Sequence, residues 1–312
     1  MKKLSDNYLH LFSPILSYTA KLIDIALDNN KKIIIWGYAK GGRWLQHLIE
    51  DYDGRIKVDR IIDNGVPSFI TSPNINRSTI FSYLENDQYL VLSTVKEYEK
   101  ILPLLIDCGY EDEINCYDVY SELGNSYISF LEKHIKGIDF SKVTTKLAGD
   151  NNHHEPFNHS CSDVVFEEIK SLGKNLSFFD FGCGLGTTMV YAYAHEIGKN
   201  IGGVDINPEL IKQATLNMKK LGIECELRCQ DATETNVDGY NVFFFYNPFN
   251  GKTFDMVIRN IHRSYCRNQR EIFIVYGNPF DHKTIVKYGF SLYKQIRVDL
   301  YDPILNIYRI GG

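Results

Sequence analysis

The sequence lacks three features that would place it in a specialised class of protein. No apolar run approaches 18 residues, so we expect no membrane-spanning helix. The seven cysteines include no Cys-x-x-Cys pair, which argues against a disulfide framework and against a metal site of the common zinc type. The first residues lack the apolar core of a signal peptide. We therefore expect a cytoplasmic protein with reduced thiols and no bound metal.

The chain also lacks a strong excess of positive charge. Its net charge is −5; residues 1–140 carry 15 Lys+Arg against 20 Asp+Glu, and residues 141–312 carry 19 of each. Binding to nucleic acid favours a basic surface, so we do not expect a nucleic-acid partner. With 312 residues, 44% hydrophobic and 23% charged, the chain has the composition of a globular protein and the length of two domains.

What the sequence does contain is a strand, a glycine-rich turn and a helix in one line. The apolar run 176–181 leads into Gly182, Gly184 and Gly186, and a helix-like stretch, 189–197, follows. This pattern predicts a buried parallel strand and a tight turn, at which a ligand can approach the main chain without meeting a Cβ atom. Asp180 places a carboxylate at the mouth of that turn.

Further acids follow at the ends of the next predicted strands. The strand 200–205 ends in Asp205, 25 residues after Asp180, where an acid can accept hydrogen bonds from both hydroxyls of a ribose. A third strand, 223–229, precedes Asp231 and Ala232. The fourth strand, 241–246, runs into Asn247-Pro248-Phe249.

Four motifs in this order resemble the class I S-adenosylmethionine-dependent methyltransferases. They are Asp-Phe-Gly-Cys-Gly-Leu-Gly at 180–186, Gly-Val-Asp-Ile-Asn-Pro-Glu-Leu at 203–210, Gln-Asp-Ala-Thr at 230–233 and Tyr-Asn-Pro-Phe at 246–249. The resemblance implies a seven-stranded sheet with its last strand antiparallel. It also implies S-adenosylmethionine as the cofactor and methyl transfer as the reaction.

The resemblance further implies which residues hold the cofactor. The glycines would line its methionine and ribose portions with Asp180 near the amino group, Asp205 would bind the ribose hydroxyls, and Asp231 would accept from the adenine amine. An alternative for Asp205 is that it caps the helix that begins at Asn207. The predicted cofactor-binding set is Asp180, Gly182, Cys183, Gly184, Gly186, Asp205, Ile206, Asp231, Ala232, Asn247, Glu155 and Pro156.

The predicted catalytic set is Asn247, Pro248, Phe249 and His154. Asn247-Pro248-Phe249 resembles the Asn/Asp-Pro-Pro-aromatic turn of amino-directed methyltransferases, with one proline fewer. Asn247 would orient the nucleophile and Phe249 would stack on the acceptor; alternatively the turn is purely structural. By resemblance, the segment 153–156 forms a lid over the cofactor, in which a histidine has the pKa range of a base. The alternative for that segment is a solvated loop.

The N-terminal part also alternates strands and helices, over residues 31–118. Gly37-Tyr-Ala-Lys-Gly-Gly42 is a degenerate dinucleotide fingerprint, and Asp63-Asn64 follows a later strand. This part resembles the Rossmann-like modules of sugar-nucleotide and surface-polysaccharide enzymes. Alternatively, the glycines only allow a strand and a helix to pack closely.

We therefore predict an α/β protein with a small N-terminal Rossmann-like parallel sheet and a C-terminal methyltransferase sheet. The expected domains are 1–123, a connecting helix and lid segment at 124–160, and 161–312. We expect methyl transfer to an oxygen or nitrogen atom of a small or carbohydrate-linked acceptor, with a homodimer left open. The alternatives are a protein or nucleic-acid amino-methyltransferase, a non-catalytic S-adenosylmethionine-binding scaffold, and a nicotinamide-dependent oxidoreductase. Arg259, Arg263 and Arg267 share a helix face, which is either solvated or an anion site.

Overall fold

The structure is a computed structural model that describes residues 4–63, 65, 75–76, 87–141, 156–157, 159–297 and 302–312. The chain divides into two compact units. The first consists mainly of Phe12–His134, and the second of Ser5–Leu11 and Ile135–Gly312. The predicted domain boundaries at residues 123 and 160 stay a prediction.

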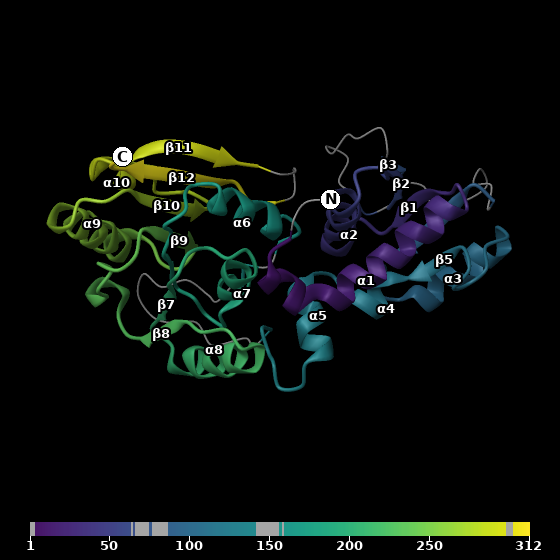
Figure 1. The fold of residues 1–312 in the computed structure, drawn as a ribbon, viewed down its shortest axis with the longest axis horizontal. Coiled ribbons are helices and arrows are strands. Elements are labelled where there is room, and N and C mark those ends of the chain that lie inside the picture. Colours follow the sequence, from purple (N-terminus) through teal and green to yellow (C-terminus); the bar gives the residue numbers. More distant parts are fainter. Residues whose placement is uncertain are drawn as a thin grey trace. The chain divides into compact units, whose positions relative to one another are not determined.

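The first unit contains a parallel sheet whose strand order is β3-β2-β1-β4-β5 (Figure 1). Its central strand is apolar after Lys32, and Ile33, Ile34 and Ile35 are fully buried, as expected for a parallel strand covered on both faces. This sheet confirms the predicted small parallel α/β sheet of the N-terminal part, whereas its likeness to the Rossmann-like modules of sugar-nucleotide enzymes stays a prediction. The elements are α1 (Asp6–Asp28), β1 (Lys32–Trp36), α2 (Lys40–Tyr52), β2 (Val58–Ile62), β3 (Ile75–Asn76), β4 (Tyr89–Ser93), α3 (Tyr98–Asp107), β5 (Cys116–Asp118), α4 (Val119–Leu123) and α5 (Tyr127–His134).

The first helix contains a proline. Pro14 should separate a short first turn from a longer helix, because proline removes one main-chain hydrogen bond and crowds the preceding turn. Instead, α1 continues through Pro14. Phe12 and Ile15, on either side of it, are fully buried, so their packing outweighs the missing hydrogen bond.

The second unit contains a seven-stranded sheet in the order β11-β12-β10-β9-β6-β7-β8 (Figure 1). β12 runs antiparallel to both of its neighbours, and the other pairs are parallel. This confirms the predicted methyltransferase sheet with its reversed last strand. The elements are α6 (Ser162–Lys170), β6 (Phe178–Phe181), α7 (Thr187–Ala194), β7 (Ile201–Asp205), α8 (Pro208–Leu221), β8 (Glu226–Cys229), η1 (Ala232–Glu234), β9 (Val242–Tyr246), α9 (Gly251–Arg267), β10 (Ile272–Gly277), α10 (His282–Lys287), β11 (Ser291–Ile296) and β12 (Leu305–Ile310).

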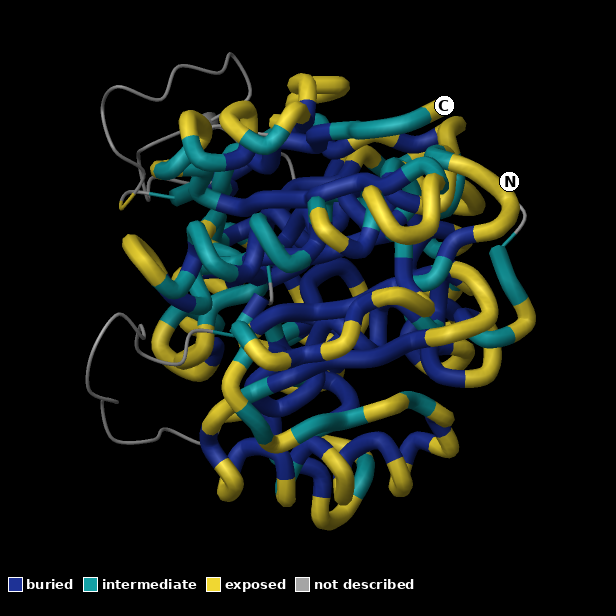
Figure 2. The backbone as a smooth tube through the Cα atoms, turned by 90° about the vertical axis from the view of Figure 1, so that its left-hand side faces the viewer, coloured by how far each residue is buried: buried dark blue, intermediate teal, exposed yellow. Residues whose placement is uncertain are grey.

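Strand periodicity decides what each face of this sheet presents. Successive side chains alternate between faces, so Phe179 and Phe181 of β6 join Phe243 and Phe245 of β9 in one cluster, against which α9 packs. On the other face, Phe244 of β9 meets aromatic rings of α6 and of β6. Figure 2 shows the central strands as continuous buried segments. Asp180 and Tyr246 have the same parity as Phe178 and Phe244, so they belong to this second face, at the carboxyl ends of β6 and β9.

Candidate functional site

The glycine-rich turn and the Asn-Pro turn are in direct contact. Gly182, Gly184 and Gly186 have φ angles of +78°, +52° and +86°, in the left-handed region that glycine adopts at little cost. A Cβ atom on Gly182 would lie 2.5 Å from the Cβ atom of Pro248, so glycine is also needed for this close approach. Asn247 has a φ of +48° and redirects the chain after β9. The fold thus brings two of the predicted motifs together at the carboxyl edge of the sheet.

Asp205 is fixed against the glycine-rich turn. Its Oδ2 accepts from the Gly184 amide at 3.0 Å and its Oδ1 from the Asn207 amide at 2.9 Å. The cap of α8 is Asn207, whose Oδ1 accepts from the amides of Glu209 and Leu210. Helix capping therefore falls to Asn207. A carboxylate with these two bonds retains acceptor capacity for the hydroxyls of a ribose.

Asp180 lies in a different environment, because its side chain is buried. Only 4% of the residue is exposed, and the Thr188 hydroxyl donates to its Oδ2 at 2.5 Å. Burial raises the pKa of Asp180 to about 8, the Thr188 hydrogen bond opposes the rise, and the charge of Asp205 adds to it. Near neutral pH this carboxyl is therefore mostly protonated, and a cationic group placed beside it would favour its ionised form.

A small cavity of about 20 Å³ lies beside Asp180, with room for about one water molecule. Thr187 Oγ1 is buried there and has no hydrogen-bond partner among the described residues. Buried polar atoms are rarely left unpaired, so this hydroxyl fits a site completed by a polar ligand group. The lining residues are Pro156, Phe157, Asp180, Gly182, Cys183, Thr187, Thr188 and Tyr246. The cavity would receive the amino-acid end of a cofactor.

A hydrogen-bonded pair beside the cavity, His159 and Tyr246, was not predicted from the sequence. His159 Nε2 lies 2.7 Å from the Tyr246 hydroxyl, and His159 Nδ1 lies 3.6 Å from Asp302 Oδ1. The three residues are far apart in the chain, so no local spacing connects them. Nor does a metal explain His159, since the described part of the chain holds no cluster of metal-ligating side chains.

Several predicted site residues take other roles in the structure. Phe249 is 4% exposed and packs edge-on to Phe181 and Phe245, and its stacking on the acceptor stays a prediction. The Cys183 side chain is buried, and burial raises the pKa of its thiol, so this residue offers its main chain only. Asp231 accepts from the Thr233 amide and hydroxyl and caps η1.

The remaining predictions concern the lid and the adenine side. Pro156 lines the cavity, whereas His154 and Glu155 lie outside the described residues. Ile206 is 45% exposed beside Asp205, which is unusual for an isoleucine and suits a side chain that covers a flat ring. Ala232 packs against the edge of the core cluster.

In the first unit, the glycines of the N-terminal turn serve close packing. A Cβ atom on Gly42 would lie 2.0 Å from the carbonyl oxygen of Gly37, so α2 can only start there with glycine. The Tyr38 amide donates to Asp63 Oδ2 at 2.5 Å. These contacts account for the glycines without a ligand. The hydrogen bond from the Tyr38 amide to Asp63 is of the same kind as the one from the Gly184 amide to Asp205. Each joins an amide of a turn to an acid at the end of a strand.

The arginines of α9 do not form a cluster directed at a ligand. Arg267 pairs with Asp238 at 2.7 Å. Arg270, just after the helix, donates to the carbonyl oxygens of Tyr240 and Asn268 and thereby holds the chain on either side of it. These contacts favour the solvated and structural interpretation of this face.

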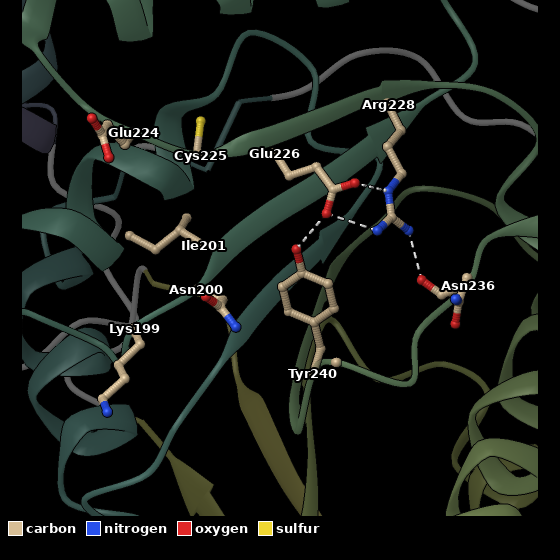
Figure 3. Close-up of a pocket in the computed structure, with 10 residues that line it drawn as sticks. Lys199, Asn200, Ile201, Glu224, Cys225, Glu226, Arg228, Asn236 and Tyr240 are labelled. Carbon is tan, nitrogen blue, oxygen red and sulfur yellow. Dashed lines mark hydrogen bonds and ion pairs between the residues drawn. The ribbon is translucent and has the colours of Figure 1, made fainter.

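A larger cavity, of about 540 Å³, lies at the opposite edge of the sheet, near the amino ends of β7, β8 and β9 (Figure 3). Its charged side chains pair with one another. Arg228 donates to both carboxylate oxygens of Glu226 at 2.8 Å and to the Asn236 carbonyl at 2.6 Å, and the Tyr240 hydroxyl also donates to Glu226. Since parallel α/β sheets bind ligands at their carboxyl edge, the smaller cavity is the better candidate site.

Part of the chain is similar to known proteins. Residues 172–276 match a family model described as a methyltransferase domain. No curated protein matches the chain. Among solved structures, it is similar to the Pyrococcus abyssi tRNA (uracil-54, C5)-methyltransferase in complex with S-adenosyl-L-homocysteine, with 18% identity and a TM-score of 0.39 over 49% of this chain and 38% of that chain. An RNA methyltransferase from Salinibacter ruber has 21% identity and a TM-score of 0.36, over 47% of this chain and 91% of that chain.

Proposed function

From this S-adenosylmethionine-dependent methyltransferase domain, we propose that the protein methylates an oxygen or nitrogen atom of a small or carbohydrate-linked acceptor. The observation that carries the proposal is the cavity between the glycine-rich turn and Tyr246, where a buried acid and an unpaired threonine hydroxyl face the same space. S-adenosylmethionine supplies an electrophilic methyl group, so the protein has to position the two reactants and remove one proton.

The surroundings of each side chain indicate which part of the cofactor it would bind. Asp180 would hold the amino group and Thr187 the carboxylate of the cofactor, with Thr188 orienting Asp180. Asp205 would hold the ribose hydroxyls while it stays bonded to the Gly184 amide. The adenine would lie against Ile206, Asp231 and Ala232, and Glu155 and Pro156 would close the site.

We further propose that the first unit, corresponding to the predicted domain 1–123, binds or orients the acceptor. Support comes from Asp63, which accepts from the Tyr38 amide as Asp205 accepts from the Gly184 amide. A strand-end acid held in this way is placed to meet a ribose hydroxyl. A sugar nucleotide would satisfy such a unit. Within the second unit, Asn247 would present its side-chain amide to the group that is methylated.

The cofactor assignment is tested by calorimetric titration with S-adenosylhomocysteine. We expect a dissociation constant in the micromolar range, about −8 kcal/mol, for the wild type. Asp205→Ala should bind about 30–100-fold more weakly, because hydrogen bonds to a charged group contribute about 2–3 kcal/mol. Asp255→Asn is the matched control, since Asp255 is a helix acid that pairs with Lys287. Absence of binding to the wild type would overturn the cofactor assignment.

The acceptor is tested by release of S-adenosylhomocysteine in the presence of a panel of uridine and thymidine diphosphate sugars. Turnover with a panel member supports the proposal. Turnover only with transfer RNA or with protein would replace it by an amino-methyltransferase. Asp63→Asn, in the first unit, should raise the Michaelis constant for the sugar nucleotide and leave the affinity for S-adenosylhomocysteine unchanged.

A further inference from the structure

Two polar side chains connect a buried carboxylate to the cavity. The side chain of Asp302 has no exposed surface, and Ser160 donates to its Oδ2 at 2.6 Å. His159 comes next, with Nδ1 3.6 Å from Asp302 Oδ1 and Nε2 2.7 Å from the Tyr246 hydroxyl. Tyr246 lines the cavity together with Asp180 and Gly182. The chain Asp302–His159–Tyr246 therefore ends at the wall of the candidate cofactor cavity.

The surrounding residues fix the Tyr246 ring in this position. A Cβ atom on Gly277 would lie 2.6 Å from the Tyr246 ring, so the glycine of the neighbouring strand leaves room for it. The Phe157 ring lies edge-on at 5.1 Å from the Tyr246 ring and 5.1 Å from His159. Edge-on aromatic contacts of this kind are favourable and directional. The Tyr246 hydroxyl is thus held toward His159.

The charge distribution selects one tautomer of His159. A buried carboxylate near Nδ1 favours a proton on that nitrogen, which leaves the Nε2 lone pair to accept from the Tyr246 hydroxyl. A phenol oxygen that donates its own proton in this way can in turn accept a proton from a bound acceptor. Two other described titratable side chains line the cavity, Asp180 and Cys183, and burial raises the pKa of both. Asp180 is already assigned to the cofactor amino group and Cys183 stays a thiol.

We propose that Tyr246 is the catalytic base for methyl transfer, with His159 and Asp302 as the positioning residues that receive and stabilise the proton. This inference rests on the proposed function. The acceptor atom forms its bond to the methyl carbon as the carbon–sulfur bond breaks, and the electron pair of that bond stays on sulfur. The acceptor proton passes to Tyr246 Oη, and the proton of Tyr246 passes to His159 Nε2. The resulting imidazolium faces the Asp302 carboxylate.

The deciding experiment is nitrogen NMR of the full chain labelled with ¹⁵N-histidine and saturated with S-adenosylhomocysteine. The His159 signals, assigned by their loss in His159→Gln, should show a neutral ring protonated on Nδ1. Tyr246→Phe should shift the Nε2 resonance, and Asp302→Asn should shift the Nδ1 resonance. A ring protonated on Nε2, or an Nε2 resonance that Tyr246→Phe leaves in place, would overturn the relay. This readout does not depend on the identity of the acceptor.

The second readout is turnover with any sugar nucleotide of the panel that the protein methylates. Tyr246→Phe should lower kcat about 100-fold, the range of general base catalysis, at unchanged affinity for S-adenosylhomocysteine. His159→Gln can still hydrogen-bond to Tyr246 but cannot take a proton, so it should lose turnover as well. A purely structural histidine would tolerate that change, and unchanged kcat in either variant would overturn the proposal.

Tyr308→Phe is the matched control. Tyr308 makes the same kind of bond, 2.9 Å from His282 Nδ1, but it lies in β12 and outside the cavity lining. Its removal should leave kcat unchanged. If the wild type binds no S-adenosylhomocysteine, the cofactor assignment fails, whereas binding with normal turnover in Tyr246→Phe removes the relay alone.

Discussion

Two acids at the same edge of the sheet lie in different surroundings. Asp205 accepts hydrogen bonds from two main-chain amides, and hydrogen bonds of this kind stabilise a carboxylate. Asp180 is buried with one hydroxyl donor, and burial raises its pKa to about 8. In the unliganded protein Asp180 is therefore mostly protonated at neutral pH, and an incoming amino group would displace that proton.

This difference predicts that binding of S-adenosylhomocysteine depends on pH. The α-amino group of the ligand is protonated below about pH 8, so pairing it with ionised Asp180 releases a proton. Affinity should rise by up to about tenfold per pH unit between pH 6 and 8. Calorimetry in buffers of different ionisation enthalpy should detect release of most of one proton per ligand at pH 6.5.

Asp180→Asn supplies the control for this linkage. The amide can still accept from Thr188, but it carries no proton to release, so the variant should bind more weakly and without pH dependence. The folded-state pKa of Asp180 lies above its ordinary value of 3.8, so its contribution to stability falls as the pH rises through that range. The variant should therefore melt at a higher temperature than the wild type at pH 8. A wild-type affinity that is constant from pH 6 to 8 contradicts the linkage.

A second residue-scale prediction concerns Thr187. Its buried hydroxyl has no partner among the described residues, and an unpaired buried polar group costs about 1–3 kcal/mol. Thr187→Val keeps the shape and removes the hydroxyl, so it should raise the free energy of unfolding, measured in urea without ligand. The same variant should bind S-adenosylhomocysteine more weakly than the wild type. A variant that is both less stable and normal in binding would show that the hydroxyl has another partner.

The residues that sequence reasoning found and missed differ in how they are encoded. The glycine-rich turn, Asp180 and Asp205 follow from local spacing, because strand ends and turns are set by near neighbours. The burial of Phe249 and the contact of His159 with Tyr246 depend on side chains more than four residues away in the chain. No single segment carries that information.

At the scale of elements, α6, α7 and the segment Ser5–Leu11 meet at one buried histidine. His195, 4% exposed, follows α7 and places its Nε2 2.9 Å from Asp163 and its Nδ1 2.9 Å from Glu167, both on α6. Tyr8 donates to the second oxygen of Asp163 at 3.0 Å. With a carboxylate at each nitrogen, the ring is bound as an imidazolium.

This arrangement predicts a pH-dependent stability. Burial alone would lower the pKa of His195, but the hydrogen bonds to Asp163 and Glu167 raise it above the ordinary value of 6.5. Because the folded-state pKa is raised, the stabilisation is complete below pH 6.5 and is lost as the pH rises through the folded-state pKa. His195→Gln should lower the free energy of unfolding by about 1–2 kcal/mol at pH 6, and by less at pH 9. Urea unfolding of both proteins at the two pH values measures this.

The opposite pattern would show that His195 is bound as a neutral ring. His282→Gln is the matched control, since His282 lies in α10 and its Nδ1 pairs with the uncharged Tyr308 hydroxyl. The order of the elements around His195 was predictable from apolar periodicity. Their attachment through one ion cluster was not, because it joins residues from three separated segments.

At the scale of the whole molecule, both sheets were predictable because each rests on repeated strand–helix units with apolar strands. The reversal of β12 followed from the resemblance. The division of the chain into two compact units was harder to predict from the sequence. Ser5–Leu11 belongs to the second unit, although it lies near the start of the chain. Hydrogen bonds from Ser5 and Asn7 to carbonyls at the end of α7 attach this segment, and such contacts leave no local pattern in the sequence.

The two units predict two thermal transitions that respond differently to the cofactor product. Each unit has its own sheet and core, so scanning calorimetry of the full chain should resolve two unfolding steps. S-adenosylhomocysteine at 100 times its dissociation constant stabilises the unit that binds it by about 2.7 kcal/mol. For a unit of this size, that raises its melting temperature by about 5–10 °C. The other transition should stay in place, and Asp205→Ala should abolish the shift of the first. If the ligand shifts both transitions together, the two units unfold as one cooperative body. The proposal that one unit binds the cofactor and the other binds the acceptor then loses its thermodynamic basis.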